Sequence, residues 1–180
     1  MITLEQMNKL PKDNSPEWII IHHSGGTDAD PLADTSHHTF KTIQDYHLSL
    51  GWENIGYHKI VEKDGKIVEG RPEHYHGAHA TNYNKKSIGI VLSGNFDVTL
   101  PTKAQEDSLR ELLVLLMAKY TIPKEKIVPH RKFANKTCFG KKLSDTWAQN
   151  LLIENACDLS KFTLNELITE VVARLNQLNK

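Results

Sequence analysis

The stretch that decides the fold is Trp18-Ile19-Ile20-Ile21-His22-His23-Ser24-Gly25-Gly26. Its uninterrupted β-branched run predicts a buried strand, and the Ser-Gly-Gly that follows predicts the end of that strand. His22 is therefore expected at the strand's end. Because successive side chains of a strand point to opposite faces of a sheet, only one of His22 and His23 can face a given site.

Further elements are predicted from the patterns that follow this strand. Apolar residues recur at helical spacing from Phe40 to Leu50, and Gly51 supplies a stop, which predicts a helix of about 12 residues. Asp64-Gly65 separates two short extended runs and predicts the tight turn of a β-hairpin over 57–69. The aperiodic range 70–86 is typical of a long functional loop. Residues 87–92 read as a central strand.

The second half of the chain is predicted to be mainly helical. Thr102 and Gln105 form a capping box that opens an amphipathic helix, and Pro123 ends it. A short extended piece follows at 127–130, and Ser144 is expected to cap a helix that carries Trp147, Leu151 and Leu152. A second capping box at 163–166 opens the strongest amphipathic helix of the chain. Strands interleaved with helices predict an α/β fold in which a central mixed β-sheet is flanked by helices.

Composition excludes several classes of protein. The 180 residues include 22 Lys+Arg and 22 Asp+Glu, so no excess of positive charge is present to neutralise nucleic-acid phosphates, and we expect no nucleic-acid partner. The longest apolar run, Leu112–Ala118, is far shorter than the roughly 20 residues of a membrane-spanning helix. The first 14 residues lack the pattern of a signal peptide, which favours synthesis in the cytoplasm.

Ten histidines are unusual for this length, and two groups of them could bind metal. The first group is His22 at the end of the first predicted strand, His130 at the end of the last extended piece, and Cys138 eight residues further along the loop that follows. Two imidazoles and one thiolate suit a catalytic zinc site, which uses three protein ligands and leaves the fourth position to water. The competing interpretation is that these are ordinary core or surface residues.

The second group is His74, His76 and His79, three histidines within six residues. In an extended chain His74 and His76 face the same way and His79 could fold back, as in binuclear metallohydrolases. The alternative is a polar loop that lines a cleft. The residues alone leave both hypotheses open.

Motifs over roughly 18–152 also follow one another in a specific order. They are Ile20 to Ser24, Gly51-Trp52-Glu53-Asn54-Ile55-Gly56-Tyr57-His58, Asp64-Gly65, Gly77-Ala78-His79, Asn84 to Ile90, and His130 to Cys138 with Lys136 two residues before the cysteine. In this order the sequence resembles the zinc-dependent N-acetylmuramoyl-L-alanine amidases (type 2 amidases) of the phage-lysozyme and peptidoglycan-recognition-protein family. One departure is Phe139, which stands where many relatives have Pro.

The resemblance implies a role for particular residues. His22, His130 and Cys138 would bind one Zn²⁺ per chain, and Tyr57 and Lys136 would complete the catalytic site. His79 and Asn84 would border the substrate groove, which makes the histidine-rich loop a cleft wall. The implied reaction is hydrolysis of the amide bond between N-acetylmuramic acid and L-alanine of peptidoglycan.

The resemblance also implies an amidase fold like that of peptidoglycan-recognition proteins. We expect a zinc amidase catalytic domain over 1–155 and a C-terminal amphipathic helical extension over 156–180. The implied partner is peptidoglycan, a glycan strand with its stem peptide, and a monomer is favoured. A phage endolysin that reaches the cell wall after release fits these expectations. The alternatives are a recognition protein that binds peptidoglycan without cleaving it and, less favoured, a metallohydrolase that uses His74, His76 and His79.

Overall fold

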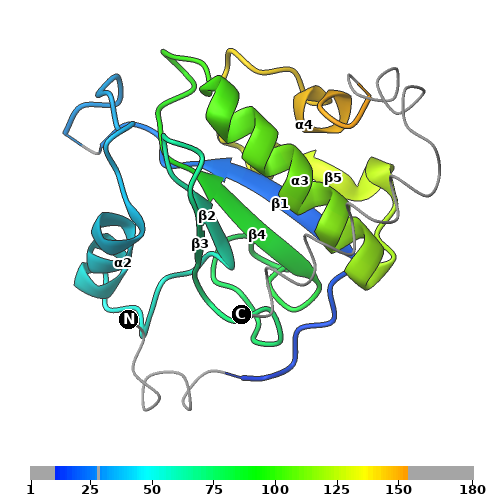
Figure 1. Cartoon of the computed structure of the whole chain (residues 1–180). Coiled ribbons are helices and arrows are strands. Elements are labelled where there is room, and N and C mark those ends of the chain that lie inside the picture. Colours follow the sequence, from blue (N-terminus) through cyan, green and yellow to red (C-terminus); the bar gives the residue numbers. More distant parts are fainter. Residues whose placement is uncertain (1–10, 28, 154–180) are drawn as a thin grey trace.

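The computed structural model describes residues 11–27 and 29–153. A five-stranded sheet in the order β3-β2-β4-β1-β5 forms its centre. Neighbouring strands are parallel except for β2 and β3, which pair as an antiparallel hairpin. Figure 1 shows β1 and β4 in the middle of the sheet. The predicted mixed sheet is confirmed, with the strands β1 (Trp18–His23), β2 (Lys59–Val61), β3 (Ile67–Glu69), β4 (Ser87–Leu92) and β5 (Ile127–Pro129).

Helix α3 (Lys103–Tyr120) covers one face of the sheet (Figure 1). The predicted capping box is present, because Thr102 Oγ1 accepts from the Gln105 amide and the Gln105 side chain accepts from the Thr102 amide. The apolar stripe of the helix packs on alternate side chains of β1 and β4, and the residues of this cluster include Ile19, Ile21, Ile88, Ile90, Leu109, Leu112, Leu113 and Leu116. Burial of this stripe holds the helix on the sheet.

The opposite face of the sheet is covered by α2 (Phe40–Ser49) and by the long loop 70–86. Ile43 of α2 packs with Ile60 and Val91, whereas Ala80 of the loop packs with Ile20 and Val128. Because side chains alternate along β1, its residues 20 and 22 face the loop, and residues 19, 21 and 23 face α3. The strand therefore presents His22 to the side that the loop covers.

Short helical turns lie on both sides of β5, and here two predictions are wrong. The extended piece ends at Pro129, so that His130 begins the 3-10 turn η2 (His130–Lys132), after the earlier turn η1 (Lys124–Lys126). Helix α4 spans only Trp147–Asn150, and its N-cap residue is Thr146 rather than Ser144. Ser144 contributes its main-chain carbonyl, which accepts from the Trp147 amide, and not a side-chain cap. The helical extension expected over 156–180 lies outside the described residues.

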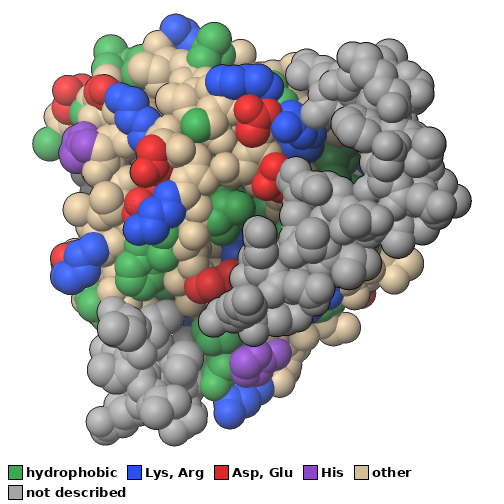
Figure 2. Space-filling view, in the orientation of Figure 1, with side chains coloured by type: hydrophobic (Ala, Val, Ile, Leu, Met, Phe, Trp, Pro, Cys, Tyr) green, Lys and Arg blue, Asp and Glu red, His purple; other side chains and the backbone are tan. Residues whose placement is uncertain are grey.

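The described surface fits the balanced composition. Figure 2 shows Lys and Arg side chains interspersed with Asp and Glu on the face that carries α3. None of the helices in the described ranges is long and apolar enough to cross a membrane.

Candidate metal centre and its cleft

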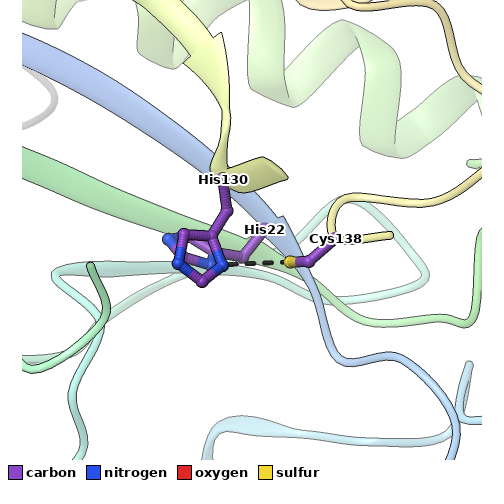
Figure 3. A group of neighbouring side chains, drawn as sticks. All are labelled: His22, His130 and Cys138. Carbon is purple, nitrogen blue, oxygen red and sulfur yellow. Dashed lines mark hydrogen bonds between the residues drawn. The ribbon is translucent and has the colours of Figure 1, made fainter. Parts of the chain in front are cut away.

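Three side chains from separate parts of the chain meet at one edge of the sheet. His22 lies near the end of β1, His130 follows β5 directly, and Cys138 lies in the loop after η2. Since β1 and β5 are parallel neighbours, their carboxyl ends bring the two histidines together. Figure 3 shows all three side chains pointing toward one another. They are the one group of three or more possible metal ligands among the described residues, with one ligand atom of each within 4.8 Å of the others.

The spacing fits a tetrahedral metal. His22 Nδ1 and Cys138 Sγ are 3.6 Å apart. A nitrogen and a sulfur bound to the same zinc at about 2.0 and 2.3 Å, with a tetrahedral angle between them, would be about 3.5 Å apart. Both the donor types and this distance therefore suit a zinc ion.

Burial shapes the electrostatics of the group. Removal from water lowers the pKa of His22 well below its usual 6.5, and electrostatic interaction with His79 and His130 acts in the same direction. Burial also lowers the pKa of His130, with Lys136 contributing. Neutral imidazole is the form that binds metal. Burial raises the pKa of the Cys138 thiol to about 12, so deprotonation of this thiol depends on a nearby cation.

The cleft over this group has a volume of about 970 Å³ and is lined by all three candidate ligands. Tyr57 also lines it, with its ring centroid 5.0 Å from that of His22. Burial raises the pKa of the Tyr57 hydroxyl above its usual 10.0, with a contribution from Cys138, so the hydroxyl stays protonated at neutral pH. Lys136 lines the same cleft with an exposed side chain. All five residues predicted for metal binding and catalysis therefore share one cleft.

His79 and Asn84 also line this cleft, but both make internal contacts. Asn84 Oδ1 accepts hydrogen bonds of 2.9 Å from the amides of His79 and Ala80 and so fixes the backbone of the loop. His79 Nδ1 lies 3.0 Å from His22 Nε2. The loop is thus a wall of the cleft whose histidine contacts a candidate ligand directly.

The other histidines near the cleft do not form a second group of metal ligands among the described residues. His74 is exposed, and His76 Nδ1 lies 2.8 Å from Asp13 Oδ1 at the surface. His58 and His47 hydrogen-bond to the backbone. His58 Nδ1 accepts from the Gly89 amide, and His47 Nδ1 accepts from the Gly56 amide. Within 11–27 and 29–153 the histidine-rich loop therefore offers no separate metal site of three ligands.

The sequence patterns did not indicate which residues support the cysteine. Phe139 is 1% exposed and packs in the core beside α3, which anchors the loop directly after Cys138. On the other side of the loop, Asp97 Oδ2 accepts from the Thr137 hydroxyl at 2.8 Å. Arg131 donates to the carbonyls of Gly140 and Leu143. The one sequence feature that could have indicated this support is Phe139, which stands where many relatives have Pro and whose side chain is buried.

An α/β sheet with imidazole and thiol ligands gathered at its strand ends, beneath an open cleft, is typical of metal-dependent hydrolases. A family model described as N-acetylmuramoyl-L-alanine amidase matches residues 12–141, and the chain belongs to this family.

Individual relatives agree with the family match. The chain is 39% identical over 119 residues to an endolysin of Escherichia phage T7, a match that covers 63% of this chain and 77% of the phage protein. It is 35% identical over 146 residues to peptidoglycan-recognition protein SC2 of Drosophila melanogaster, covering 78% and 79% of the two chains. Among solved structures, the N-acetylmuramoyl-L-alanine amidase LysC from Clostridium intestinale superimposes with a TM-score of 0.70 at 31% identity, over 80% of this chain and 89% of that one. The predicted fold class is confirmed.

Proposed function

We propose that the chain is a zinc-dependent peptidoglycan hydrolase that cleaves the amide bond between the lactyl group of N-acetylmuramic acid and L-alanine. The convergence of His22, His130 and Cys138 within 4.8 Å at the base of the cleft carries this proposal. These three residues would hold one Zn²⁺ per chain. When bound, zinc supplies a Lewis acid and lowers the pKa of a coordinated water to about 7.

Lys136 is proposed to stabilise the negative charge that develops on the carbonyl oxygen as the amide is attacked. Its exposed ammonium lines the cleft and can move toward that oxygen. Tyr57 is proposed to hold or relay a proton at the reacting groups. Because burial raises the pKa of its hydroxyl, Tyr57 acts as a hydrogen-bond donor at neutral pH rather than as an anion.

His79 and Asn84 are proposed to border the groove that receives the glycan and its stem peptide. Both line the cleft, and a groove for such a polar substrate needs fixed hydrogen-bonding groups. Similarity to the phage T7 endolysin supports a role in cell-wall degradation after release from the cytoplasm. We propose that the catalytic unit, residues 1–155, acts as a monomer, with 156–180 as an extension.

Binding without cleavage is the second candidate function, and the similarity to peptidoglycan-recognition protein SC2 favours it. Against it stands the complete set of Cys138, Tyr57 and Lys136 in one cleft.

One assay separates the two functions. Purified protein is incubated with cell-wall fragments, with a chelator, and with chelator followed by excess zinc, and newly exposed N-terminal L-alanine is measured. The amidase proposal expects release that the chelator abolishes and zinc restores. Sedimentation of the protein with the fragments without any release would leave only the recognition function.

A further inference from the structure

His79 is held in a slot that two glycines create. A Cβ atom on Gly77 would lie 2.4 Å from His79 Cδ2, and one on Gly89 would lie 2.5 Å from the same ring. Such distances are not tolerated between non-bonded carbon atoms, so the ring can occupy this place only because both residues lack a side chain. Gly89 lies in the middle of β4, opposite Ile20 of β1. The fold therefore places this imidazole tightly against the sheet beside His22.

Hydrogen bonds on both sides of the ring define where its proton lies. The Ser87 hydroxyl has one hydrogen, and the Tyr83 carbonyl, 2.7 Å from Ser87 Oγ, accepts it. His79 Nε2 is 3.3 Å from Ser87 Oγ, which can then only accept, so Nε2 of His79 carries a proton. A neutral His79 is left with a lone pair on Nδ1.

The same argument extends to His22. His79 Nδ1 and His22 Nε2 are 3.0 Å apart, and one hydrogen must lie between them. Since His79 Nδ1 accepts, His22 Nε2 donates. The alternative, an imidazolium at His79, would put an unpaired charge into a partly buried site beside a second histidine, which is costly. The Nδ1 atom of His22 is then unprotonated, and it is this atom that lies 3.6 Å from Cys138 Sγ.

We infer that Ser87 and His79 are positioning residues that fix the tautomer and the ring orientation of His22, so that its Nδ1 lone pair points to the metal position. This inference rests on the proposed function, because it takes His22 as a zinc ligand. His79 thereby acquires a task that does not require contact with substrate. Partners of this kind typically contribute a factor of 10–100 to metal affinity.

Zinc affinity, measured by competition with a chromophoric chelator, tests the inference. We expect His79→Ala to weaken zinc binding by about 10- to 100-fold and Ser87→Ala to weaken it in the same direction by less. His79→Asn, which can place a carboxamide oxygen near the former Nδ1, should bind more tightly than His79→Ala. His74→Ala is the matched control, since this exposed histidine of the same loop should leave affinity unchanged.

A second measurement covers the case that a variant does not fold. In the metal-free parent protein, the ¹⁵N chemical shifts of the His22 ring should report a proton on Nε2, and in Ser87→Ala they should move toward a mixture of tautomers. A proton on Nδ1 in the parent, or folded His79→Ala and Ser87→Ala proteins that bind zinc within twofold of the parent, would overturn the inference while the proposed function stands. A parent that binds no zinc would overturn the proposed function itself.

Discussion

The Nδ1 atom of His22 lies 3.6 Å from the sulfur of Cys138, although 116 residues separate them in sequence. The two side chains are held from independent directions. His22 belongs to a central strand that is buried along nearly its whole length, whereas Cys138 lies on a loop that a core phenylalanine and an arginine secure. A metal that binds both would join the sheet to this loop, so metal affinity and loop stability should be coupled.

Cys138→Ser should abolish zinc binding and amidase activity together. A neutral hydroxyl is a far poorer zinc ligand than a thiolate. The two histidines alone would leave the site one ligand short of the three that a catalytic zinc site uses. Zinc content after gel filtration and release of L-alanine from cell-wall fragments are the two measurements. Thr137→Ser, at the exposed neighbouring position, is the control and should keep both properties. Full zinc retention in Cys138→Ser would contradict the assignment of this ligand.

Much of this arrangement could be predicted from the sequence, because buried strands have strong local signals. The β-branched run at 19–21 predicts strand β1, and the capping box at Thr102 predicts the start of helix α3. The loop 70–86 was harder, since its histidines have the same composition whether they bind metal or support backbone. Only the fold reveals that the His79 ring lies where a side chain on Gly89 would be. The two residues are ten positions apart, and neither periodicity nor local spacing predicts this contact.

Lys136→Ala should retain zinc but lower turnover by about 10²-fold or more, the usual loss when one stabiliser of a developing oxyanion is removed. Because the side chain is exposed, its removal should leave the free energy of unfolding nearly unchanged. Steady-state kinetics on soluble muropeptide and zinc content are measured on the same preparation. Lys132→Ala removes an exposed lysine of the same segment and serves as the control. Equal turnover in Lys136→Ala and the parent would exclude Lys136 from the mechanism.

Phe139→Ala should lower both stability and zinc affinity. The side chain is 1% exposed, and truncation of a buried phenylalanine typically costs about 3–5 kcal/mol. The neighbouring Cys138 should then lose its fixed position. Leu151→Ala is the matched control, because this residue is 3% exposed in the same core cluster but lies outside the cysteine loop. Urea unfolding of the metal-free proteins and chelator competition should show destabilisation in both variants and weaker zinc binding only in Phe139→Ala.

The start of the long loop contains a carboxylate that should make stability depend on pH. Glu73 lies 2.5 Å from Lys59 Nζ and 2.7 Å from Lys119 Nζ, and the Tyr120 hydroxyl donates to it. Burial by itself raises the pKa of Glu73, but the hydrogen bonds from Lys119, Lys59 and Tyr120 outweigh burial and hold the pKa at about 2, below its ordinary 4.5. Because the folded protein binds the proton more weakly than the unfolded chain, the ionised Glu73 stabilises the fold above pH 4.5.

This contribution should be lost as the pH falls from 4.5 toward 2. Glu73→Gln should therefore lower the free energy of unfolding by up to about 3 kcal/mol at neutral pH, and its difference from the parent should shrink through that acidic range. Urea unfolding with chelator present measures this, since zinc release then makes no contribution. Glu69→Gln is the control: it also removes a partner of Lys59, but that carboxylate is 70% exposed, so the effect should be small. A Glu73→Gln deficit that is the same at pH 7 and at acidic pH would show that the network stabilises by packing rather than through the charge of Glu73.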